Sequence, residues 1–529
     1  MRSSRREEAP SIVLKVAATF TATSQTIHKV GRATPCAPQT ASGQRNGAHG
    51  VTRPTISPCV WSALLFVALT LTACTKKPAA PAAQDFRLFF TCDIRGRLVP
   101  CGCFTGQYGG MTRLKTVLDG DTSTNSLRVD IGDALAGPED FQVIQHRYIL
   151  RAFADLRYDA LNLGHREAQL SAAQLRALRT NSTVPIFSAN LLDRKTGAPL
   201  FDTHRLVKRG PHTLALVGVM DPRVPADSLG DGLAIEKMET VLGRLLPQLK
   251  KQADAIVLLA FTDEATLAKL AQEFYELDIV LGGKVSQPAQ KLERENKSLI
   301  YYTSNEGRAL GLLELRLAGR GQLTATKNDI VLLHDRIPQA EPLQAINAAY
   351  RDEIRRTKLA VDDPARLQEN MVPGVRQTVS FAGSESCAKC HATAFKAWKS
   401  SSHADAFATL VHEKADADPN CIGCHTVGFG TPSGYRREFA RAKLVDVGCE
   451  SCHGPGSQHV AQYESGGAVT FKFRPLGAGD CQKCHHGEFS RPFVWEKFWP
   501  KVAHGKEPAK ARGEAMRKAR ELIASKNRR

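Results

Sequence analysis

Four copies of the sequence C-x-x-C-H near the C-terminus constrain this chain more than any other feature. Each copy places two thiols one helical turn apart, where both can add to the vinyl groups of a haem, and puts a histidine beside them to reach the iron. Zinc knuckles and redox dithiols also use paired cysteines, but neither needs a histidine directly after the second cysteine. We therefore expect four covalent haem c groups, each with a proximal histidine: Cys387 and Cys390 with His391, Cys421 and Cys424 with His425, Cys449 and Cys452 with His453, and Cys481 and Cys484 with His485.

The same region has few residues with which to build an ordinary apolar core. Eight of the 14 cysteines and nine of the 16 histidines fall within residues 387–504, and Gly and Pro interrupt the helical patterns. So short a segment cannot enclose four macrocycles in aliphatic side chains. Haem must supply much of the core, with Trp398, Trp495 and Trp499 packed on it. The region should therefore not fold without haem.

Histidines outside the motifs are candidates for the second axial position on the irons: His403, His412, His459, His486 and His504. The segment from about 380 to 505, above all the string C-E-S-C-H-G-P-G-S-Q-H that ends at His459, resembles the tetrahaem cytochrome family that accepts electrons from hydroxylamine oxidoreductase. The resemblance implies three bis-histidine haems, with His403, His459 and His504 as distal ligands, and a five-coordinate haem on His425. Which distal histidine serves which iron stays open. His412 and His486 are expected at the surface, unless one of them supplies a fourth distal ligand.

Upstream, apolar runs alternate with helical stretches from residue 86 to about 337, which indicates a layered α/β domain around a buried sheet. The expected strands lie in RLFFTCD, SLRVDIGD, DALNLG, PIFSANLL, TLALVGV, AIVLLAF, DIVLGG, SLIYYTS and LGLLELRL. Three strand ends, T-C-D-I-R-G from Thr91, Gly132-Asp133 and G-H-R-E from Gly164, resemble the metal-dependent phosphoesterase domain of periplasmic 5'-nucleotidases and of the sulfur-oxidising thiosulfohydrolase. The expected fold class is therefore multidomain: a layered α/β metallophosphoesterase-like domain followed by a mainly α-helical or irregular multihaem cytochrome c domain.

The departures from the phosphoesterase family concern its two-metal site. The resemblance places the site at Asp93, Arg95, Asp133, His165, Arg166 and Lys284. Arg95, Arg166 and Lys284 stand where the family has histidines, His165 replaces an asparagine, and Phe261 and Ser286 replace two further histidines. A guanidinium stays protonated at neutral pH and cannot bind a cation, so we expect no hydrolysis by two metals. The cations either form a structural ion-pair cluster with Asp93 and Asp133 or bind an anion. A hydrolase with a rebuilt metal site is the remaining alternative.

Three more cysteines border this site: Cys92, Cys101 and Cys103. In an oxidising compartment two of them should pair, so we expect a disulfide between Cys92 and either Cys101 or Cys103. A thiolate metal site that includes His165 is the alternative.

The N-terminal segment carries an export signal. Residues 59–73 form a nearly uncharged run, too short for the roughly 20 residues of a membrane-spanning helix and typical of a signal peptide. The sequence L-T-A-C that ends at Cys74 resembles a bacterial lipobox, which implies lipidation of Cys74. Cleavage as a secreted protein and a retained anchor are the alternatives.

The expected boundaries are 1–73 for the signal peptide and an N-terminal extension, 74–85 for the tether, 86–337 for the phosphoesterase-like domain, 338–380 for a helical linker, 381–505 for the tetrahaem domain and 506–529 for a basic tail.

The charge distribution argues against nucleic acid as a partner. The net charge is +18, but residues 1–53 contribute +6 and residues 501–529 contribute +7, so the excess lies in the two terminal segments rather than on a folded face.

We expect a lipoprotein of the bacterial cell envelope, facing the periplasm or the outer surface, that transfers electrons between redox partner proteins and is not an enzyme. A haem oxidoreductase acting on a small nitrogen or sulfur compound is the alternative.

Overall fold

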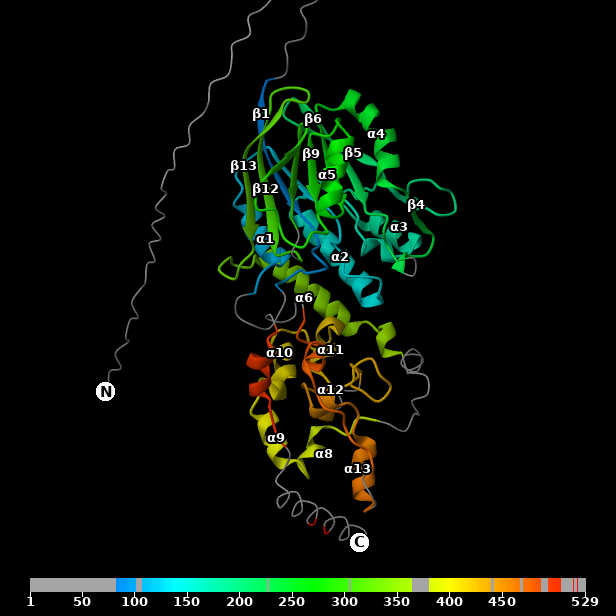
Figure 1. The fold of residues 1–529 in the computed structure, drawn as a ribbon, viewed down its shortest axis with the longest axis vertical. Helices are drawn as coiled ribbons and strands as arrows, with labels where there is room; N and C mark the ends of the chain where they lie inside the picture. The colour runs from blue at the N-terminus through cyan, green and yellow to red at the C-terminus, as the bar shows by residue number, and fades with distance from the viewer. Residues whose placement is uncertain are drawn as a thin grey trace, which may run out of the picture. The chain divides into compact units, whose positions relative to one another are not determined.

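The computed structural model describes residues 82–100, 107–225, 228–303, 306–363, 380–438, 442–466, 470–486 and 493–505, together with residues 517 and 521 (Figure 1). The apolar segment 59–73, Cys74, Cys101, Cys103 and most of the basic tail lie outside the described residues.

Five strands form the first sheet of the α/β domain, in the order β13-β12-β1-β2-β3. Strand β1 (Gln84–Thr91) is parallel to β2 (Ser126–Asp130), which is parallel to β3 (Ala160–Leu161). On its other side β1 is antiparallel to β12 (Ala309–Leu317), which pairs antiparallel with β13 (Leu323–Leu332). The parallel part of this sheet therefore brings the ends of β1, β2 and β3 to one edge.

Six strands form the second sheet, in the order β10-β11-β9-β8-β6-β5. Their bounds are β10 Glu293–Glu295, β11 Ser298–Tyr302, β9 Ile279–Gly282, β8 Ala255–Phe261, β6 His212–Met220 and β5 His204–Arg209. The four central strands β11, β9, β8 and β6 are parallel, and both edge strands are antiparallel to their neighbours. Strands β4 (Leu191–Asp193) and β7 (Leu233–Ile235) form a separate antiparallel pair.

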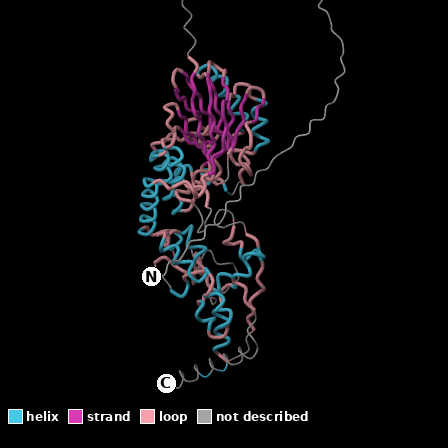
Figure 2. Tube along the Cα trace, turned by 90° about the vertical axis from the view of Figure 1, so that its left-hand side faces the viewer, coloured by secondary structure: helices cyan, strands magenta, loops and turns pink. Residues whose placement is uncertain are grey.

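The alternation of side chains along β8 builds a core on each face of the second sheet. All seven β8 residues are buried, and successive side chains point to opposite faces. Val257 belongs to a cluster shared with the first sheet, whereas Leu258 belongs to a cluster with helices α4 (Met238–Gln252) and α5 (Glu264–Glu273). Further helices add side chains to the shared cluster: α1 (Met111–Asp119), α2 (Asp140–Asp155), α3 (Ala172–Asn181) and α6 (Glu341–Arg356). The result is the expected layered α/β domain, with strands inside and helices outside (Figure 2).

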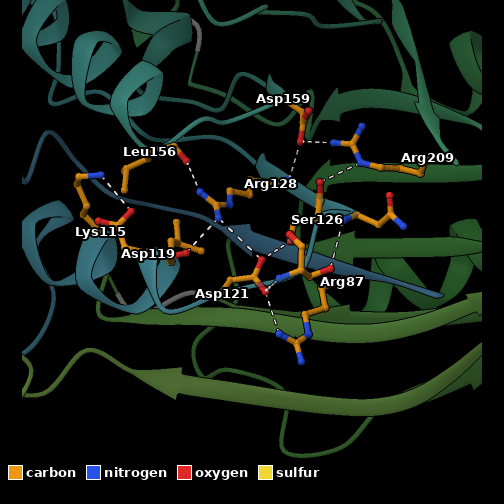
Figure 3. A network of polar contacts seen from close by, with 12 residues as sticks. Arg87, Lys115, Asp119, Asp121, Ser126, Arg128, Leu156, Asp159 and Arg209 are labelled. Atoms are coloured by element: carbon orange, nitrogen blue, oxygen red, sulfur yellow. Dashed lines mark hydrogen bonds and ion pairs between the residues drawn. The ribbon is translucent and has the colours of Figure 1, made fainter.

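A polar network around Asp121 joins the first halves of β1 and β2 to the end of β5 (Figure 3). Asp121 accepts hydrogen bonds from Arg87 at 2.8 Å and from the hydroxyl of Ser126, and lies 3.9 Å from Arg128. Although burial opposes it, bonding by Ser126 and Arg87 lowers the pKa of Asp121 below its ordinary value. Arg209 of β5 donates to the Ser126 carbonyl at 2.9 Å. The network therefore joins β1, β2 and β5 at the edge opposite to the strand ends that carry the phosphoesterase-like residues.

The segment from residue 380 onward consists of short helices and irregular chain. The helices are α8 Ser384–Ala388, α9 Ala392–Lys399, α10 Ala406–His412, α11 Pro419–His425, α12 Cys449–His453, α13 Ser457–Glu464, α14 Ala478–Cys481 and α15 Trp495–Phe498. Their one buried apolar cluster in the described residues is small: Leu410, Ala415, Ile422, Val427, Tyr435 and Leu444. Across the described parts of the chain, no helix combines the length and the apolar character needed to cross a bilayer.

The amphipathic helix expected between the two regions is α6. It buries Leu343, Tyr350 and Ile354 in the apolar cluster of the α/β domain. From its last turn, Arg355 forms an ion pair of 2.7 Å with Asp416. The helix is therefore part of the α/β core rather than a free connector.

Candidate functional site

Each C-x-x-C-H motif forms a helical turn. Helices α11 and α12 contain the whole of the second and third motifs. In the first motif the His391 N–H donates to the Cys387 carbonyl at 2.9 Å, and in the fourth the His485 N–H donates to the Cys481 carbonyl at 2.8 Å. The turn brings both cysteines and the histidine to one side of the chain, as the spacing predicts.

Three of the four motif histidines face a second imidazole. The pairs are His391 with His459, His485 with His403, and His453 with His504, with ring centres 6.3, 6.0 and 5.9 Å apart. An imidazole nitrogen lies about 2 Å from a metal that it binds and about 1 Å from its own ring centre, so two rings on opposite sides of a metal have centres roughly 6 Å apart. Each pair therefore leaves room for one iron, and the side chains fit haem c.

The orientation of several rings keeps one nitrogen available for a metal. Nδ1 of His425 donates to the Ala406 carbonyl at 2.7 Å, and Nδ1 of His504 donates to the Val502 carbonyl at 2.9 Å. Because a carbonyl only accepts, Nδ1 carries the proton and Nε2 keeps its lone pair. Burial lowers the pKa of further rings, which favours the neutral form that binds metals: His403, His453 and His485.

His425 differs from the other three motif histidines, because no second imidazole among the described residues is paired with it. His412 lies at the surface, with its side chain 85% exposed and Nδ1 3.1 Å from Glu413. His486 is exposed as well. Both positions agree with the expectation from the sequence.

The motifs form two neighbouring groups. The thiol of Cys387 is within hydrogen-bonding reach of Cys449, which joins the first and third motifs. The thiol of Cys424 is within reach of Cys484, which joins the second and fourth. Groups attached at these cysteines would therefore lie side by side in pairs, an arrangement suited to passing electrons between them.

Glu450, which sequence reasoning missed, fixes the loops around the first and third motifs. Its side chain is 4% exposed, and its carboxylate accepts hydrogen bonds from the N–H groups of Ala382, Gly383 and Gly456 at 2.9, 2.7 and 2.6 Å. The carboxylate thus ties the chain before Cys387 to the loop after the third motif. Its place inside the C-E-S-C-H-G-P-G string was the available signal.

In the α/β domain, the phosphoesterase-like residues gather at the edge where parallel strands end. They follow the strands in the order Asp93 after β1, Asp133 after β2, His165 and Arg166 after β3, and Lys284 after β9. Asp93, Arg95, Asp133 and Lys284 all have φ between 52° and 57°. Non-glycine residues seldom adopt this backbone, and where they do they concentrate at functional sites.

The expected ion pairs with Asp93 and Asp133 form only in part. Arg95 Nε lies 2.6 Å from Asp93 Oδ1, but Lys284 Nζ lies 2.8 Å from Asp221 instead. The expectation for Lys284 was wrong because Asp221 follows β6, in the same sheet as β9, whereas Asp93 and Asp133 follow strands of the other sheet. The Arg223 guanidinium donates to both Asp221 oxygens, from Nε to Oδ1 and from Nη2 to Oδ2, each at 2.8 Å. Although burial opposes the shift, these cations hold the pKa of Asp221 well below its ordinary value.

Arg166 approaches Asp133 through its backbone. Its N–H donates to Asp133 Oδ1 at 2.8 Å, while its guanidinium donates to the Ala136 carbonyl at 2.7 Å. Burial, followed by the neighbouring Glu167, raises the pKa of Asp133 well above its ordinary value. Glu167 accepts from the N–H of Asp133 at 3.0 Å and of Gly164 at 2.7 Å. This side of the edge is therefore held by carboxylate bonds to backbone.

The side chains of His165 and Cys92 form hydrogen bonds with different partners. His165 Nε2 donates to the Asp221 carbonyl at 2.8 Å, and its ring packs on Phe261 with centres 5.2 Å apart. Cys92 is a free, fully buried thiol that donates to the Gly132 carbonyl at 3.4 Å. The expected disulfide of Cys92 is wrong, because its sulfur points into the core. In the described residues, no group of three or more His, Cys, Asp or Glu side chains is placed to hold a metal ion.

Asp221, Arg223 and Glu306 are the residues at this edge that sequence reasoning missed. Glu306 accepts a hydrogen bond from Arg95 at 3.0 Å and lies 3.2 Å from Arg308, so this carboxylate is placed between two cations, as Asp221 is. For Asp221 the signal was present, since it directly follows the apolar run that forms β6. Nothing local in the sequence marks Glu306.

The C-terminal region is similar to known cytochromes. Residues 386–454 match the family described as cytochrome c554 and c-prime. The chain is 36% identical to cytochrome c-554 of Nitrosomonas europaea over 102 residues, which are 16% of this chain and 43% of that cytochrome. The solved structure of reduced cytochrome c554 from the same organism aligns with 24% of this chain and 79% of its own, at 26% identity and a TM-score of 0.18.

The N-terminal region is similar to nucleotidases. The chain is 25% identical to 5'-nucleotidase of Homo sapiens over 302 residues, which are 51% of this chain and 52% of that enzyme. A 5'-nucleotidase precursor from Thermus thermophilus aligns with 51% of this chain and 59% of its own, at 21% identity and a TM-score of 0.46. The chain spans about half the length, or less, of the curated relatives it matches. It joins an N-terminal domain similar to 5'-nucleotidases to a C-terminal domain similar to cytochrome c554.

Proposed function

We propose that the chain is an exported electron-transfer protein that carries four haem c groups, three of them bis-histidine and one with an open axial face. The observation that carries the proposal is the set of three imidazole pairs at metal-spanning distance beside a fourth motif histidine that has no such partner in the described residues. Reversible one-electron chemistry is what haem iron supplies when bound.

The residues divide the work of holding these groups. The eight motif cysteines attach the macrocycles, and His391, His425, His453 and His485 are the proximal ligands. The distal ligands are His459 opposite His391, His403 opposite His485, and His504 opposite His453. The backbone carbonyls that accept from Nδ1 fix the rings of His425 and His504, so that Nε2 of each ring keeps its lone pair.

Spin state tests the assignment. A five-coordinate haem is high spin and binds cyanide or carbon monoxide, whereas bis-histidine haems stay low spin. We expect about one haem in four to be high spin in the oxidised protein, and His403→Ala to raise this to about two in four. His412→Ala is the matched control, because that ring is exposed, and should leave the spectrum unchanged. Electron paramagnetic resonance and cyanide titration measure both; wholly low-spin spectra of the wild type would rule out the open face.

A haem oxidoreductase is the second candidate, because an open face at His425 could also bind a small nitrogen or sulfur compound. The two functions differ in turnover. An electron carrier exchanges electrons with a partner and consumes no small substrate, while the oxidoreductase converts nitric oxide, hydroxylamine or sulfite at a rate that cyanide abolishes. Stopped-flow mixing of reduced protein with each compound separates the two.

We infer that the α/β domain does not hydrolyse phosphate esters through two metals. Arg95 and Lys284 each fill a family ligand position with a cation, and Arg95 also pairs with Asp93, a carboxylate that a metal would need. The measurement is metal content of the full haem-loaded chain after exposure to Mn²⁺ or Zn²⁺, together with hydrolysis of AMP. Two equivalents of metal per chain, or metal-dependent hydrolysis, would restore the hydrolase with a rebuilt site.

We propose further that the protein is anchored through a lipidated Cys74 and exchanges electrons with redox partners in the cell envelope. Cys74→Ala should release the protein from membranes with its haem content unchanged, and recovery in the membrane fraction would contradict the anchor. The basic tail could dock an acidic partner. In that case association weakens with salt, and a chain ending at Lys510 binds less well than the full chain.

A further inference from the structure

A cavity of about 360 Å³ lies in the α/β domain at the edge opposite to Asp93. Its lining includes Arg316, whose register partner is Asp85 near the start of β1, whereas Asp93 follows the end of that strand. The eight residues of β1 at about 3.3 Å each put roughly 26 Å between the two edges. The cavity is therefore separate from the phosphoesterase-like residues and belongs to none of the sites described above.

The cavity lining is cationic. Arg294, Lys297 and Arg316 line it together with a single carboxylate, Asp278. That carboxylate is 3% exposed and already accepts hydrogen bonds from the Ile256 N–H at 2.9 Å and from Lys297. The lining therefore carries more positive charge than Asp278 can balance.

The two arginines are not strongly engaged elsewhere. Arg316 lies 3.4 Å from Asp85, but the two side chains are 56% and 70% exposed, and such pairs contribute little. Arg294 donates to the Lys297 carbonyl at 3.3 Å, a neutral partner. Both guanidinium groups thus remain available to an anion that enters the cavity.

A second lysine adds to the uncompensated charge. A Cβ built at Gly321, in the cavity lining, would lie 3.5 Å from Nζ of Lys250 and 4.0 Å from Nζ of Lys297, so the two ammonium groups share one small space. Burial lowers the pKa of Lys250, the Asp278 carboxylate opposes this shift, and the neighbouring Lys297 adds to it. Gly321 has φ of +68° and no side chain, which keeps this space open.

We propose that this cavity binds a phosphate-bearing anion through Arg294, Lys297 and Arg316, with Lys250 next to its lining at Gly321. Arginine forks match phosphate oxygens two at a time, and the lysines add point charges beneath them. The volume falls at the small end of the roughly 300–1,000 Å³ of ligand pockets, which fits a small organic phosphate or one phospholipid headgroup better than a large cofactor. A headgroup is a possible source of the phosphate because Gln84, at this edge, is only ten residues after Cys74. This second source rests on the proposed lipid anchor, whereas the soluble source does not.

Calorimetry on the full haem-loaded protein tests the soluble source, with pyrophosphate as the probe. The wild type should bind pyrophosphate, and the double variant Arg294→Gln/Arg316→Gln should bind at least tenfold more weakly. Both replaced side chains are exposed, so the fold should survive, and an unchanged melting temperature checks this. The matched control is Arg205→Gln/Lys208→Gln on β5, which removes the same charge from two exposed positions of the same domain and should not change binding.

Vesicles test the headgroup source. The Cys74→Ala protein is sedimented with phosphatidylglycerol vesicles and with phosphatidylcholine vesicles, with and without the Arg294→Gln/Arg316→Gln pair. Binding to pyrophosphate alone supports a soluble phosphate, and arginine-dependent binding to the phosphatidylglycerol vesicles supports a headgroup. The proposal is overturned if the wild type binds neither probe, or if the control pair weakens binding as much as the cavity pair. Since haem takes no part in the cavity, either result leaves the proposed electron-transfer function unaffected.

Discussion

The two regions of this chain reach a folded state by different means. The α/β domain buries whole strands such as β8, and its clusters fill both faces of the second sheet. Among its described residues the cytochrome region has one cluster of six buried apolar side chains, and its helices α9 and α13 have no buried residue. Burial of apolar surface stabilises a fold by about 25 cal/mol per Å². One region therefore supplies its own core, whereas the described residues of the other bury few apolar side chains.

Preventing haem attachment tests this contrast most severely. Replacing all eight motif cysteines by serine removes the covalent links to haem, and with them the haem groups proposed to lie between the paired imidazoles. We expect residues 381–505 to lose hydrogen-exchange protection while β8 and β6 keep theirs. Exchange measured by mass spectrometry reports each segment separately. Retained protection at α11 and α12 would mean that the cytochrome region folds on its own side chains.

The converse change is a cavity in the α/β core. Phe153 of α2 is fully buried, with its ring 4.7 Å from that of Tyr158. Phe153→Ala should lower the free energy of unfolding of the α/β domain by about 3–5 kcal/mol, with the haem absorption spectrum unchanged. Chemical denaturation is followed by two signals. Far-ultraviolet circular dichroism reports loss of secondary structure, and haem absorbance reports the cytochrome region alone. Tyr275→Ala, at a side chain 66% exposed, is the control and should have almost no effect.

The contrast also explains what the sequence could predict. All nine apolar runs expected to hold strands do contain strand residues, because a buried strand needs a continuous apolar run. Strands β5, β7, β10 and β13 were missed. Strands β5, β10 and β13 are edge strands with many polar residues, such as the LTATKNDIVL of β13, and β7 has only three residues. Their pairing depends on the neighbouring strand and not on their own composition.

At the sites, local chemistry was predictable and long-range pairing was not. The C-x-x-C-H spacing determines its helical turn, and the surface position of His412 follows from its charged neighbours. That His403 faces His485 rather than a nearer motif depends on how segments about 80 residues apart pack together. The same holds for Lys284, which pairs with Asp221 from another strand.

Acid should destabilise the α/β domain through a buried histidine. His146 is fully buried, and its Nε2 accepts hydrogen bonds from the Ala136 and Gly137 N–H groups at 3.2 and 3.4 Å. Burial lowers the pKa of His146 to about 3. As the pH falls below about 6.5, the unfolded chain takes up the proton first, so stability declines until the pH reaches the folded pKa. At pH 5 the loss is about 2 kcal/mol.

The variant His146→Gln isolates this contribution, because its amide oxygen can still accept from the two N–H groups but does not titrate. We expect the difference in unfolding free energy between pH 7 and pH 5 to be about 2 kcal/mol smaller in the variant than in the wild type. Urea denaturation at the two pH values measures it. An identical pH dependence would mean that burial does not shift the pKa of His146, because the folded and unfolded chains would then take up the proton alike.

The smallest expected effect concerns exposed charge on the α/β domain, and it sharpens the comparison by showing where stability does not reside. Arg244 of α4 makes two bonds to Glu236, at 3.0 and 3.2 Å, with its own side chain 51% exposed. The geometry is good, yet water competes for both groups and the long side chain loses freedom when held, so Arg244→Gln should change the unfolding free energy by less than about 0.5 kcal/mol. Denaturation in low and in high salt measures the change, and salt should reduce it further. A loss comparable to that of Phe153→Ala would mean that surface charge, and not the apolar core, holds this domain together.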